Sequence, residues 1–567
     1  MNQVALTKMI PELKSSYVES FQEDKDRHFN FVLIGKKRKW NVGLYFPEDF
    51  PYCLPKSTLL DKDLIGTLAH VNQVGTICME ESDSVFADYT RPHDIVCQYI
   101  EDVVRFLALV SLSTCQDELL DELEGYYSPD KSVGSFYHAK DKAEMVYLRF
   151  SEPAGKKGRK NFVPVVICDR NQSLPAQFSN VKQLGQYQAI NILHLPLDNA
   201  VLPPADGKDF SSQYFSSLHT HVNEKNKKII NKLVKQCRTF NMFYVLLTMP
   251  RSIGERTQFL LRFSADKHLP HPIVEHSNDW QIDMFSLTRN SKEYLVERGG
   301  GEISLSNKRV AVVGCGSVGS QVANMLAKTG IGELVLIDRD LLSADNIYRH
   351  HLGGRELNYK ANEKSGAVTS WSKVSALACQ LQQDLPYIKV LSKHSCLAEV
   401  IDDKDLGTCD VIVVAVGAPS VNLQINKMLK NNNFNNVVFC WNEAAGVGGH
   451  SIALDLQKSC YQCLYTEGQN LTAQSELSLV CAGQPISKNL TGCAGVFTPF
   501  SFIDSNRTAE LAATQVIDIL VTNASELATS WKGNNSSKLK TTDRYNTMPL
   551  KEQLPLTRHP HCRVCHD

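Results

Sequence analysis

The sequence has no excess of charge of either sign and no apolar run long enough to span a membrane. Its 60 lysines and arginines almost balance 61 aspartates and glutamates, so no overall field draws the chain to nucleic acid or to an anionic membrane. No segment approaches the roughly 20 apolar residues of a transmembrane helix, and Pro11 and charged residues interrupt the beginning of the chain, unlike a secretory leader. We therefore expect a cytoplasmic protein with no direct nucleic-acid or membrane contact.

The cysteines are too thinly spread for the disulfide framework of a small secreted domain, because 17 of them are scattered over 567 residues. Four of them form two Cys-x-x-Cys pairs, Cys460 with Cys463 and Cys562 with Cys565. Such pairs supply the four thiolates of a tetrahedral zinc site with no open position, which predicts structural Zn²⁺. Possible substitute ligands flank the second pair: His559, His561 and His566.

A chain of this length should divide into several domains. We predict a multidomain α/β protein with three parts: residues 1–125, 126–290 and 291–567. The first part mixes strand-like runs with a helical apolar period and should be α+β. The second should be an α/β linker domain of unknown role, with strands near 162–168, 190–193 and 242–247. The third alternates strand, glycine loop and helix, which predicts a Rossmann-like parallel sheet; its polar stretch 530–538 is expected to be an exposed loop.

A glycine-rich motif follows a β-branched strand in the third part. It reads Gly314-x-Gly316-x-x-Gly319 and opens a helix-like stretch. Such glycines allow a tight turn and close approach of phosphate to the backbone, while the helix N-terminus donates N–H groups. Asp338 ends the next strand, at the spacing where a carboxylate meets ribose hydroxyls. By itself this pattern favours a nicotinamide-dependent dehydrogenase.

The residues after Asp338 point to different chemistry. Asp340, Asn346, Arg349 and Lys373 follow in an order that resembles the ThiF-type adenylating superfamily, which includes ubiquitin-activating enzymes. The resemblance implies ATP as substrate, with Asp338 holding the ribose and the residues matching Asn346, Arg349 and Lys373 around the phosphates. Fixed cations and amide donors stabilise the charge that accumulates when a carboxylate attacks the α-phosphate.

Two departures from the superfamily pattern leave choices open. Gly417 stands where the family places an aspartate that binds Mg²⁺. The substitutes for that ligand are Asp340 and Asp410. The interval between Arg349 and Lys373 is also longer than usual, so other lysines compete for the phosphate-binding role. These rivals are Lys360 and Lys364.

A cysteine suited to thioester formation lies between the first zinc pair and a helix-like segment at 508–520. This residue, Cys493, matches the neighbourhood in which ubiquitin-activating relatives carry their thioester. A thiol near a helix N-terminus has a lowered pKa and greater reactivity at neutral pH. Cys481 lies in the same stretch and is its rival.

A second candidate nucleophile, Cys78, lies near the start of the chain. The motifs Phe46-Pro-x-x-Phe50-Pro, His70-x-Asn72 and Gly75-x-Ile-Cys78 resemble the ubiquitin-conjugating fold over about the first 125 residues. This resemblance implies that Cys78 carries an acyl thioester, that Asn72 supports the oxyanion, and that His70 is structural. The usual His-Pro-Asn is His-Val-Asn here, and the interval to the cysteine is short.

The order of the three parts resembles the fused activating and conjugating enzymes of bacterial anti-phage CBASS operons. This resemblance implies that ATP activates a protein C-terminus, that Cys493 and then Cys78 carry it, and that a target amine receives it. The activated protein in those systems resembles a cGAS/DncV-like nucleotidyltransferase. ThiF-type domains pair as homodimers, with Arg289 or Arg298 as candidates to reach the partner's nucleotide. The alternatives are activation of a sulfur-carrier or ubiquitin-like protein for cofactor biosynthesis, and a noncatalytic nucleotide-binding scaffold.

Overall fold

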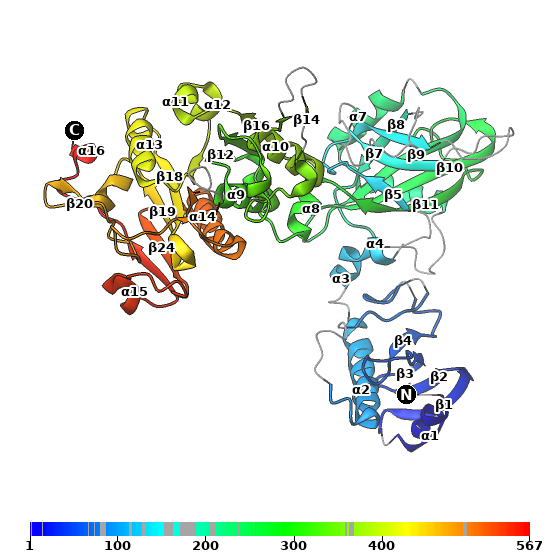
Figure 1. Cartoon of the computed structure of the whole chain (residues 1–567). Helices are drawn as coiled ribbons and strands as arrows, with labels where there is room; N and C mark the ends of the chain where they lie inside the picture. The colour runs from blue at the N-terminus through cyan, green and yellow to red at the C-terminus, as the bar shows by residue number, and fades with distance from the viewer. Residues whose placement is uncertain are drawn as a thin grey trace. The chain divides into compact units, whose positions relative to one another are not determined.

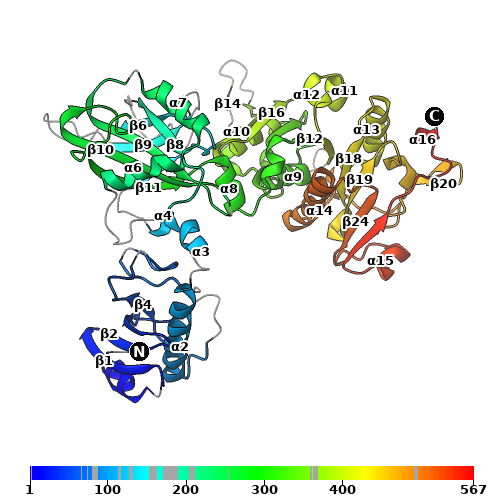
Figure 2. The same cartoon turned by 180° about the vertical axis from the view of Figure 1, so that it is seen from behind.

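The computed structural model describes most of the chain and divides it into two compact units (Figures 1 and 2). One unit holds Met1–Leu174 and Asn180–Ser291, and the other holds Lys292–Asp567. The residues that are not described are 2, 14, 66, 73, 80–86, 113–115, 127–131, 152–162, 170–188, 203–210, 236, 253, 358–359, 362–367, 491–495 and 567. Within the described residues, no helix has both the length and the apolar character needed to cross a membrane.

The first unit begins with a four-stranded antiparallel sheet in sequential order. Its elements are α1 (Gln3–Met9), β1 (Val18–Lys25), β2 (His28–Ile34), β3 (Lys39–Tyr45), β4 (Lys56–Leu59) and α2 (Pro92–Val110). Strand β2 alternates buried Phe29, Phe31 and Leu33 with more exposed residues, as a sheet with one covered face requires. The apolar face of α2, including Ile100 and Val103, joins the same core.

The middle of the chain is a closed barrel of strands in the order β10-β11-β5-β7-β6-β8-β9. Its strands are β5 (Ser132–Ser135), β6 (Glu144–Ser151), β7 (Val163–Cys168), β8 (Ala189–Pro196), β9 (Phe240–Met249), β10 (Thr257–Leu269) and β11 (Gln281–Arg289). Two helices, α6 (Ser212–Leu218) and α7 (Glu224–Val234), share a hydrophobic cluster with β8, β9 and β10. The strands expected near 162–168, 190–193 and 242–247 are present as β7, β8 and β9. Closure into a barrel was not expected, because β5 pairs with β11 more than 100 residues away, and sequence periodicity does not show such pairings.

Two short helices, α3 (Gln116–Asp121) and α4 (Leu123–Tyr126), connect the sheet to the barrel in sequence. Asp121 accepts a hydrogen bond from the Ser252 amide at 2.9 Å, and Glu124 forms an ion pair with Arg289. These contacts attach the connecting helices to the barrel.

The second unit is built on an eight-stranded sheet in the order β16-β13-β12-β17-β18-β19-β24-β25. Its strands are β12 (Arg309–Val313), β13 (Glu333–Ile337), β16 (Lys389–Lys393), β17 (Val411–Val414), β18 (Asn436–Asn442), β19 (Gly448–Asp455), β24 (Leu527–Lys532) and β25 (Lys551–Pro555). The strands from β16 to β18 are parallel, and the remaining three are antiparallel.

Helices cover both faces of this sheet. One face packs against α9 (Ser317–Lys328), α10 (Lys373–Asp384) and α14 (Phe502–Thr522). The other packs against α11 (Leu397–Val400), α12 (Lys404–Gly407) and α13 (Pro419–Asn431). Five adjacent parallel strands covered on both faces confirm the predicted multidomain α/β architecture at the level of this unit.

The stretch expected to be an exposed loop after residue 530 is partly a buried strand. Ser530 is fully buried and Trp531 is 6% exposed in β24. The polar side chains are tolerated because each has a partner: His450 Nδ1 lies 2.8 Å from Ser530 Oγ, and Gln515 donates to Thr529 Oγ1 at 3.1 Å. Polar composition alone predicted a loop because those partners are 14 to 80 residues away in the sequence.

Candidate functional site

The glycine loop between β12 and α9 leaves open space above its middle residue. Gly314 has φ = +85°, a conformation that favours glycine. A Cβ atom on Gly319 would lie 1.9 Å from the Gly314 carbonyl oxygen, so close helix packing requires a glycine there. A Cβ atom on Gly316 would meet no atom within 4 Å. The space over Gly316 and the uncapped start of α9 fit a phosphate group.

A cavity of about 490 Å³ lies at the carboxyl ends of β12, β13 and β17. Its lining includes Gly314, Gly316, Asp338, Asp340 and Lys373. One oxygen of Asp338 accepts a hydrogen bond from the Cys315 amide and the other from the Asp340 amide, both at 2.8 Å. These bonds fix the carboxylate at the edge of the cavity, where ligands bind to open parallel sheets.

Lys373 is the lysine that the structure brings to this cavity. It is only 8% exposed at the start of α10, and its Nζ donates to Asp340 Oδ2 at 2.8 Å. The Lys373 amide also donates to the Asp340 carbonyl oxygen at 3.0 Å. The side chain of Lys360 and the whole of Lys364 lie outside the described residues. The ammonium group of Lys373 is therefore held in place in the cavity that Asp338 and the glycine loop also line.

Asn346 and Arg349 lie outside the set of residues that line the cavity. Asn346 Oδ1 accepts a hydrogen bond from the Ser343 amide at 3.0 Å, which closes a local turn. The Arg349 guanidinium lies 5.1 Å from the centre of the Phe500 ring, and its Nη1 donates to the Thr498 carbonyl oxygen at 3.4 Å. In this structure Arg349 thus contacts the segment that follows Cys493 in sequence.

Asp410 is placed where it cannot serve the nucleotide cavity. It precedes β17 at the amino end of that strand, and its carboxylate accepts a hydrogen bond from the Arg309 amide at 2.8 Å. The cavity is at the carboxyl end of the same strand. The suggestion that Asp410 binds Mg²⁺ is therefore wrong, and Asp340 is the carboxylate of the two that lines the cavity.

A second cavity of about 620 Å³ adjoins the first, since both are lined by Gly316, Ala415 and Val416. Glu443, which follows β18, also lines it, and its Oε1 lies 3.1 Å from Nε2 of the buried His450. Sequence reasoning missed Glu443, although its position just after a parallel strand was a usable signal. Because Gly316 lines both cavities, the C-terminus of a protein bound in one cavity would lie close to a phosphate bound in the other.

Of the two rival thioester cysteines, Cys481 and Cys493, only Cys481 lies within the described residues. Cys493 falls within 491–495, outside the described residues. Cys481 is half-buried and lines the second cavity, and its amide donates to the Lys540 carbonyl oxygen at 2.9 Å. Helix α14 begins at Phe502 with a capping box between Ser501 and Asp504.

The four paired cysteines converge at one point of the second unit. The Sγ atoms of Cys460 and Cys463 lie 3.9 Å apart, and those of Cys460 and Cys562, and of Cys463 and Cys565, lie 3.6 Å apart. All four lie within 4.8 Å of one another. Zn–S bonds of about 2.3 Å in a tetrahedron place sulfurs about 3.8 Å apart. The spacing therefore fits Zn²⁺, and no flanking histidine joins this cluster among the described residues.

Replacing Cys463 with serine should remove bound zinc and lower the melting temperature by more than about 5 °C, because metal binding contributes directly to folding. Metal content by mass spectrometry and a thermal melt measure both effects. Cys237→Ser, at an exposed cysteine in the other unit, is the matched control and should change neither. If wild-type protein purified without zinc had the same melting temperature as zinc-containing protein, the prediction would be wrong.

Cys78 is exposed, on a segment that is hydrogen-bonded to the four-stranded sheet. Its amide donates to the His70 carbonyl oxygen at 2.7 Å, and the Ile77 amide donates to the Ser57 carbonyl oxygen at 3.0 Å. Gly75 has φ = +84°, and a Cβ atom there would lie 2.4 Å from the Leu59 carbonyl oxygen. The Gly-x-Ile-Cys motif is thus a structural requirement for holding the thiol on this edge.

Asn72 and His70 shape the same loop. Asn72 Oδ1 accepts hydrogen bonds from the amides of Val74 at 3.1 Å and Thr76 at 2.9 Å, which fixes the carboxamide plane. His70 Nδ1 lies 2.5 Å from Glu122 Oε1, and the His70 amide donates to Glu122 Oε2 at 2.9 Å. These contacts agree with the structural role expected of His70.

Glu122, between α3 and α4, is a residue that sequence reasoning missed. Although Cys78 is exposed, partial desolvation of its side chain raises the pKa of the thiol, and the negative charge of Glu122 raises it further. Cys78 is therefore mainly a protonated thiol at neutral pH. No motif marked Glu122, because it lies 52 residues from the loop that it holds.

Arg289 is not available to reach a partner's nucleotide. It is 8% exposed, and its guanidinium forms ion pairs with Glu124 and, at 3.1 Å, with Glu255. The suggestion for Arg289 is therefore wrong. Arg298, at the exposed end of α8 (Lys292–Arg298), is the remaining candidate of the two.

The glycine loop, Asp338 and Lys373 around one cavity are what an adenylating site requires. Residues 293–564 match the ThiF family. The matched residues include all those that line this cavity, together with Cys460, Cys463 and Cys562. The nicotinamide-dependent dehydrogenase suggested by the glycine motif alone is thereby set aside.

Relatives of known name extend the similarity beyond the ThiF domain. The chain is 25% identical over 540 residues to an Escherichia coli protein named ATP-dependent ubiquitin transferase-like protein Cap2, covering 88% of this chain and 86% of that protein. It is 26% identical over 249 residues to a Pseudomonas aeruginosa protein of the same name, covering 41% of this chain and only 40% of that protein. The predicted resemblance to fused activating and conjugating enzymes is confirmed.

Other matches cover less of the chain. The Bos taurus adenylyltransferase and sulfurtransferase MOCS3 is 35% identical over 97 residues, which are 17% of this chain and 20% of that protein. A crystal structure of E. coli MccB aligns with 48% of this chain and 68% of its own at 19% identity and a TM-score of 0.33. The sequence matches support an ATP-dependent adenylating transferase of the ubiquitin-activating type.

Proposed function

We propose that this protein activates the C-terminal carboxylate of a protein with ATP and conjugates it to an amine through two cysteines. The observation that carries the proposal is the cavity in which Lys373, Asp338 and the open glycine loop meet, within a chain similar over most of its length to a ubiquitin transferase-like protein. A nucleotide site alone would serve many reactions. Conjugation is favoured because the chain also has an exposed cysteine, Cys78, on a segment that is hydrogen-bonded to the sheet.

The first step is adenylation. Asp338 would hold the ribose, and the amides around Gly316 with the ammonium of Lys373 would stabilise negative charge on the phosphates. The substrate carboxylate, entering through the second cavity, attacks the α-phosphorus, and pyrophosphate leaves. Asn346 and Arg349 would complete the phosphate contacts only after moving from their partners Ser343 and Thr498.

The next steps pass the acyl group between thiols. Cys493 attacks the acyl adenylate, forming a thioester and releasing AMP. Cys78 then displaces Cys493 from the acyl carbon, and its proton passes to the Cys493 thiolate. Finally a target amine attacks the Cys78 thioester, an amide forms, and Cys78 leaves as a thiol. Asn72, in a ubiquitin-conjugating-like domain, would stabilise the oxyanion of this last step.

Two metal ions belong to the proposal. Mg²⁺, held by Asp340, would neutralise phosphate charge when ATP is bound. Zn²⁺ on Cys460, Cys463, Cys562 and Cys565 would tie the C-terminal turn to the ThiF domain as a structural link. We also propose a cytoplasmic homodimer in which Arg298 reaches toward the partner's nucleotide.

The protein that is activated is proposed to be a cGAS/DncV-like nucleotidyltransferase, and the pathway is proposed to be anti-phage CBASS defence. ATP–pyrophosphate exchange tests the adenylation step: labelled pyrophosphate should enter ATP only when the carrier protein with its free C-terminus is present. Exchange with the carrier but not with a version lacking its last residues supports the proposal. Absence of exchange with nucleotidyltransferases and ubiquitin-like carriers alike would favour the noncatalytic scaffold.

A second candidate is activation of a sulfur-carrier protein for cofactor biosynthesis. The similarity of 97 residues of this chain to an adenylyltransferase and sulfurtransferase favours it. That reaction needs the nucleotide cavity but gives Cys78 no role. Transfer of sulfur, rather than a target amine, to the activated C-terminus would identify this activity.

A further inference from the structure

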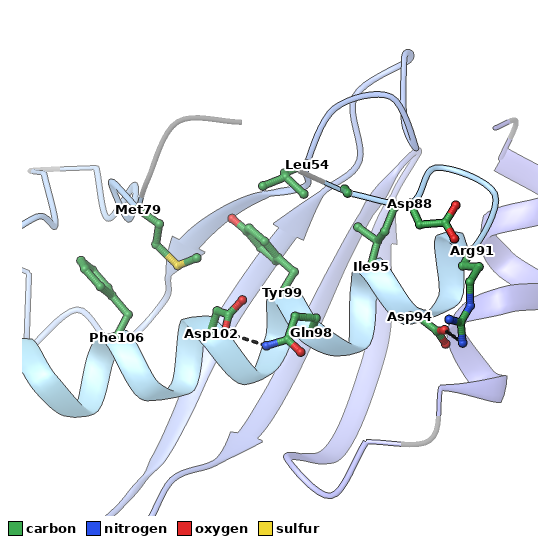
Figure 3. A pocket seen from close by; sticks show the side chains of 11 residues that line it. Leu54, Met79, Asp88, Arg91, Asp94, Ile95, Gln98, Tyr99, Asp102 and Phe106 are labelled. Carbon is green, nitrogen blue, oxygen red and sulfur yellow. Dashed lines mark hydrogen bonds and ion pairs between the residues drawn. The ribbon is translucent and has the colours of Figure 1, made fainter. Parts of the chain in front are cut away.

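A cavity of about 600 Å³ lies along α2, and its lining includes Met79, which follows Cys78 in the sequence (Figure 3). Its floor is apolar, and Ile95 and Tyr99 point from α2 toward Leu54. Met79, the neighbour of Cys78, closes one end together with Phe106. This volume is within the range of about 300–1,000 Å³ typical of ligand sites, which suits the side chains of a short peptide segment.

The rim of this cavity is acidic. It carries three carboxylates, on Asp88, Asp94 and Asp102, against one guanidinium, on Arg91. Arg91 already forms an ion pair with Asp94. Asp88 accepts hydrogen bonds from its neighbour Thr90, and Asp102 accepts one from Gln98 at 2.9 Å. The hydrogen bonds from Thr90, and then the charge of Arg91, lower the pKa of Asp88, but a single guanidinium stands against three carboxylates, so the rim keeps an excess of negative charge.

We propose that this groove docks the acceptor, as a peptide segment in which an apolar side chain is followed by lysine. The apolar residue would lie against Leu54, Ile95 and Tyr99, and the flanking positive charges would face Asp88 and Asp102. A lysine at the Met79 end would then present its amine beside the Cys78 thioester. The inference rests on the proposed conjugation at Cys78, because it names the acceptor of that reaction.

Charge favours this occupant over the tail of the activated carrier. An ammonium group gains from a rim with three carboxylates and one guanidinium, whereas a thioester-linked carrier tail brings no positive charge of its own to the rim. Glu122 adds a further negative charge near Cys78, because its carboxylate raises the pKa of that thiol.

Peptide protection of Cys78 tests the docking without ATP or carrier. The full chain is alkylated with neutral iodoacetamide, and the rate at Cys78 is measured by peptide mass spectrometry, with exposed Cys237 as the internal control. The probes are acetyl-Ala-Leu-Lys-Lys-Ala-amide, its Leu-Glu-Glu and Ala-Lys-Lys counterparts, and Ala-Leu-Gly-Gly with a free carboxylate as a stand-in for a carrier tail. Only the Leu-Lys-Lys peptide should slow alkylation of Cys78, leaving the rate at Cys237 unchanged.

The double variant Asp88→Asn, Asp102→Asn should need about ten times more Leu-Lys-Lys peptide for the same protection. Asp24→Asn, an exposed carboxylate on β1, is the matched control and should behave as the wild type. Equal protection by the Leu-Glu-Glu peptide, protection mainly by Ala-Leu-Gly-Gly, or none from any peptide would overturn the inference. Because no adenylation is involved, such a failure is separate from failure of the proposed function, which pyrophosphate exchange reports.

Discussion

Lys373→Ala is expected to lower carrier-dependent ATP–pyrophosphate exchange by about 10²–10³-fold, the loss typical of removing one group that stabilises transition-state charge. The ammonium lies in a cavity with Asp338 and the glycine loop, and it is only 8% exposed, so little water weakens its field. No second lysine lines this cavity among the described residues. The exchange rate at saturating ATP and carrier measures the effect.

The controls separate catalysis from folding. Lys389→Ala removes an exposed lysine that pairs with Glu333 at 2.9 Å in the same sheet, and it should leave exchange unchanged. Asp340→Asn keeps Lys373 but removes its partner and the carboxylate proposed to hold Mg²⁺, so it should also lower exchange. Unlike Lys373→Ala, it should recover part of the rate at a higher Mg²⁺ concentration. A Lys373→Ala variant with a wild-type melting temperature and wild-type exchange would refute the assignment.

Cys493→Ala should abolish every thiol-sensitive adduct between the chain and its carrier while leaving pyrophosphate exchange in place. Adenylation needs only the nucleotide cavity, whereas the thioester needs the nucleophile. Non-reducing gels, with and without dithiothreitol, measure the adduct, and the exchange assay reports the first step on the same preparation.

Cys481→Ala is the matched comparison, because Cys481 lines the cavity that adjoins the nucleotide site. If Cys493 is the first acceptor, Cys481→Ala keeps the adduct. Loss of the adduct in Cys481→Ala with retention in Cys493→Ala would reverse the assignment and make the cavity-lining thiol the first nucleophile.

Much of the nucleotide site was predictable, because its signals are local. The strand, glycine loop and helix around Gly314–Gly319 are contiguous, and Asp338 ends the next strand. Local patterns do not show which polar groups pair across the fold. Arg289 was expected near a nucleotide, but it is buried against Glu124 and Glu255, 165 and 34 residues away.

The barrel and the groove could not be predicted from the sequence, because both depend on contacts between residues far apart in the chain. Strand β5 pairs with β7 and β11, so the barrel depends on contacts that join distant parts of the chain. The groove combines Leu54 and Met79 with one face of α2, and the apolar period of that helix indicated only a core. Glu122, which holds His70, belongs to a connecting segment without any motif.

Cys78→Ala shows whether the acyl group passes through both cysteines. With ATP, Mg²⁺ and the carrier, this variant should keep the dithiothreitol-sensitive adduct on Cys493 but form none of the dithiothreitol-resistant amide conjugates of the wild type. Cys237→Ser, at another exposed cysteine, should form both. Amide conjugates in wild-type amounts from Cys78→Ala would contradict transfer through Cys78.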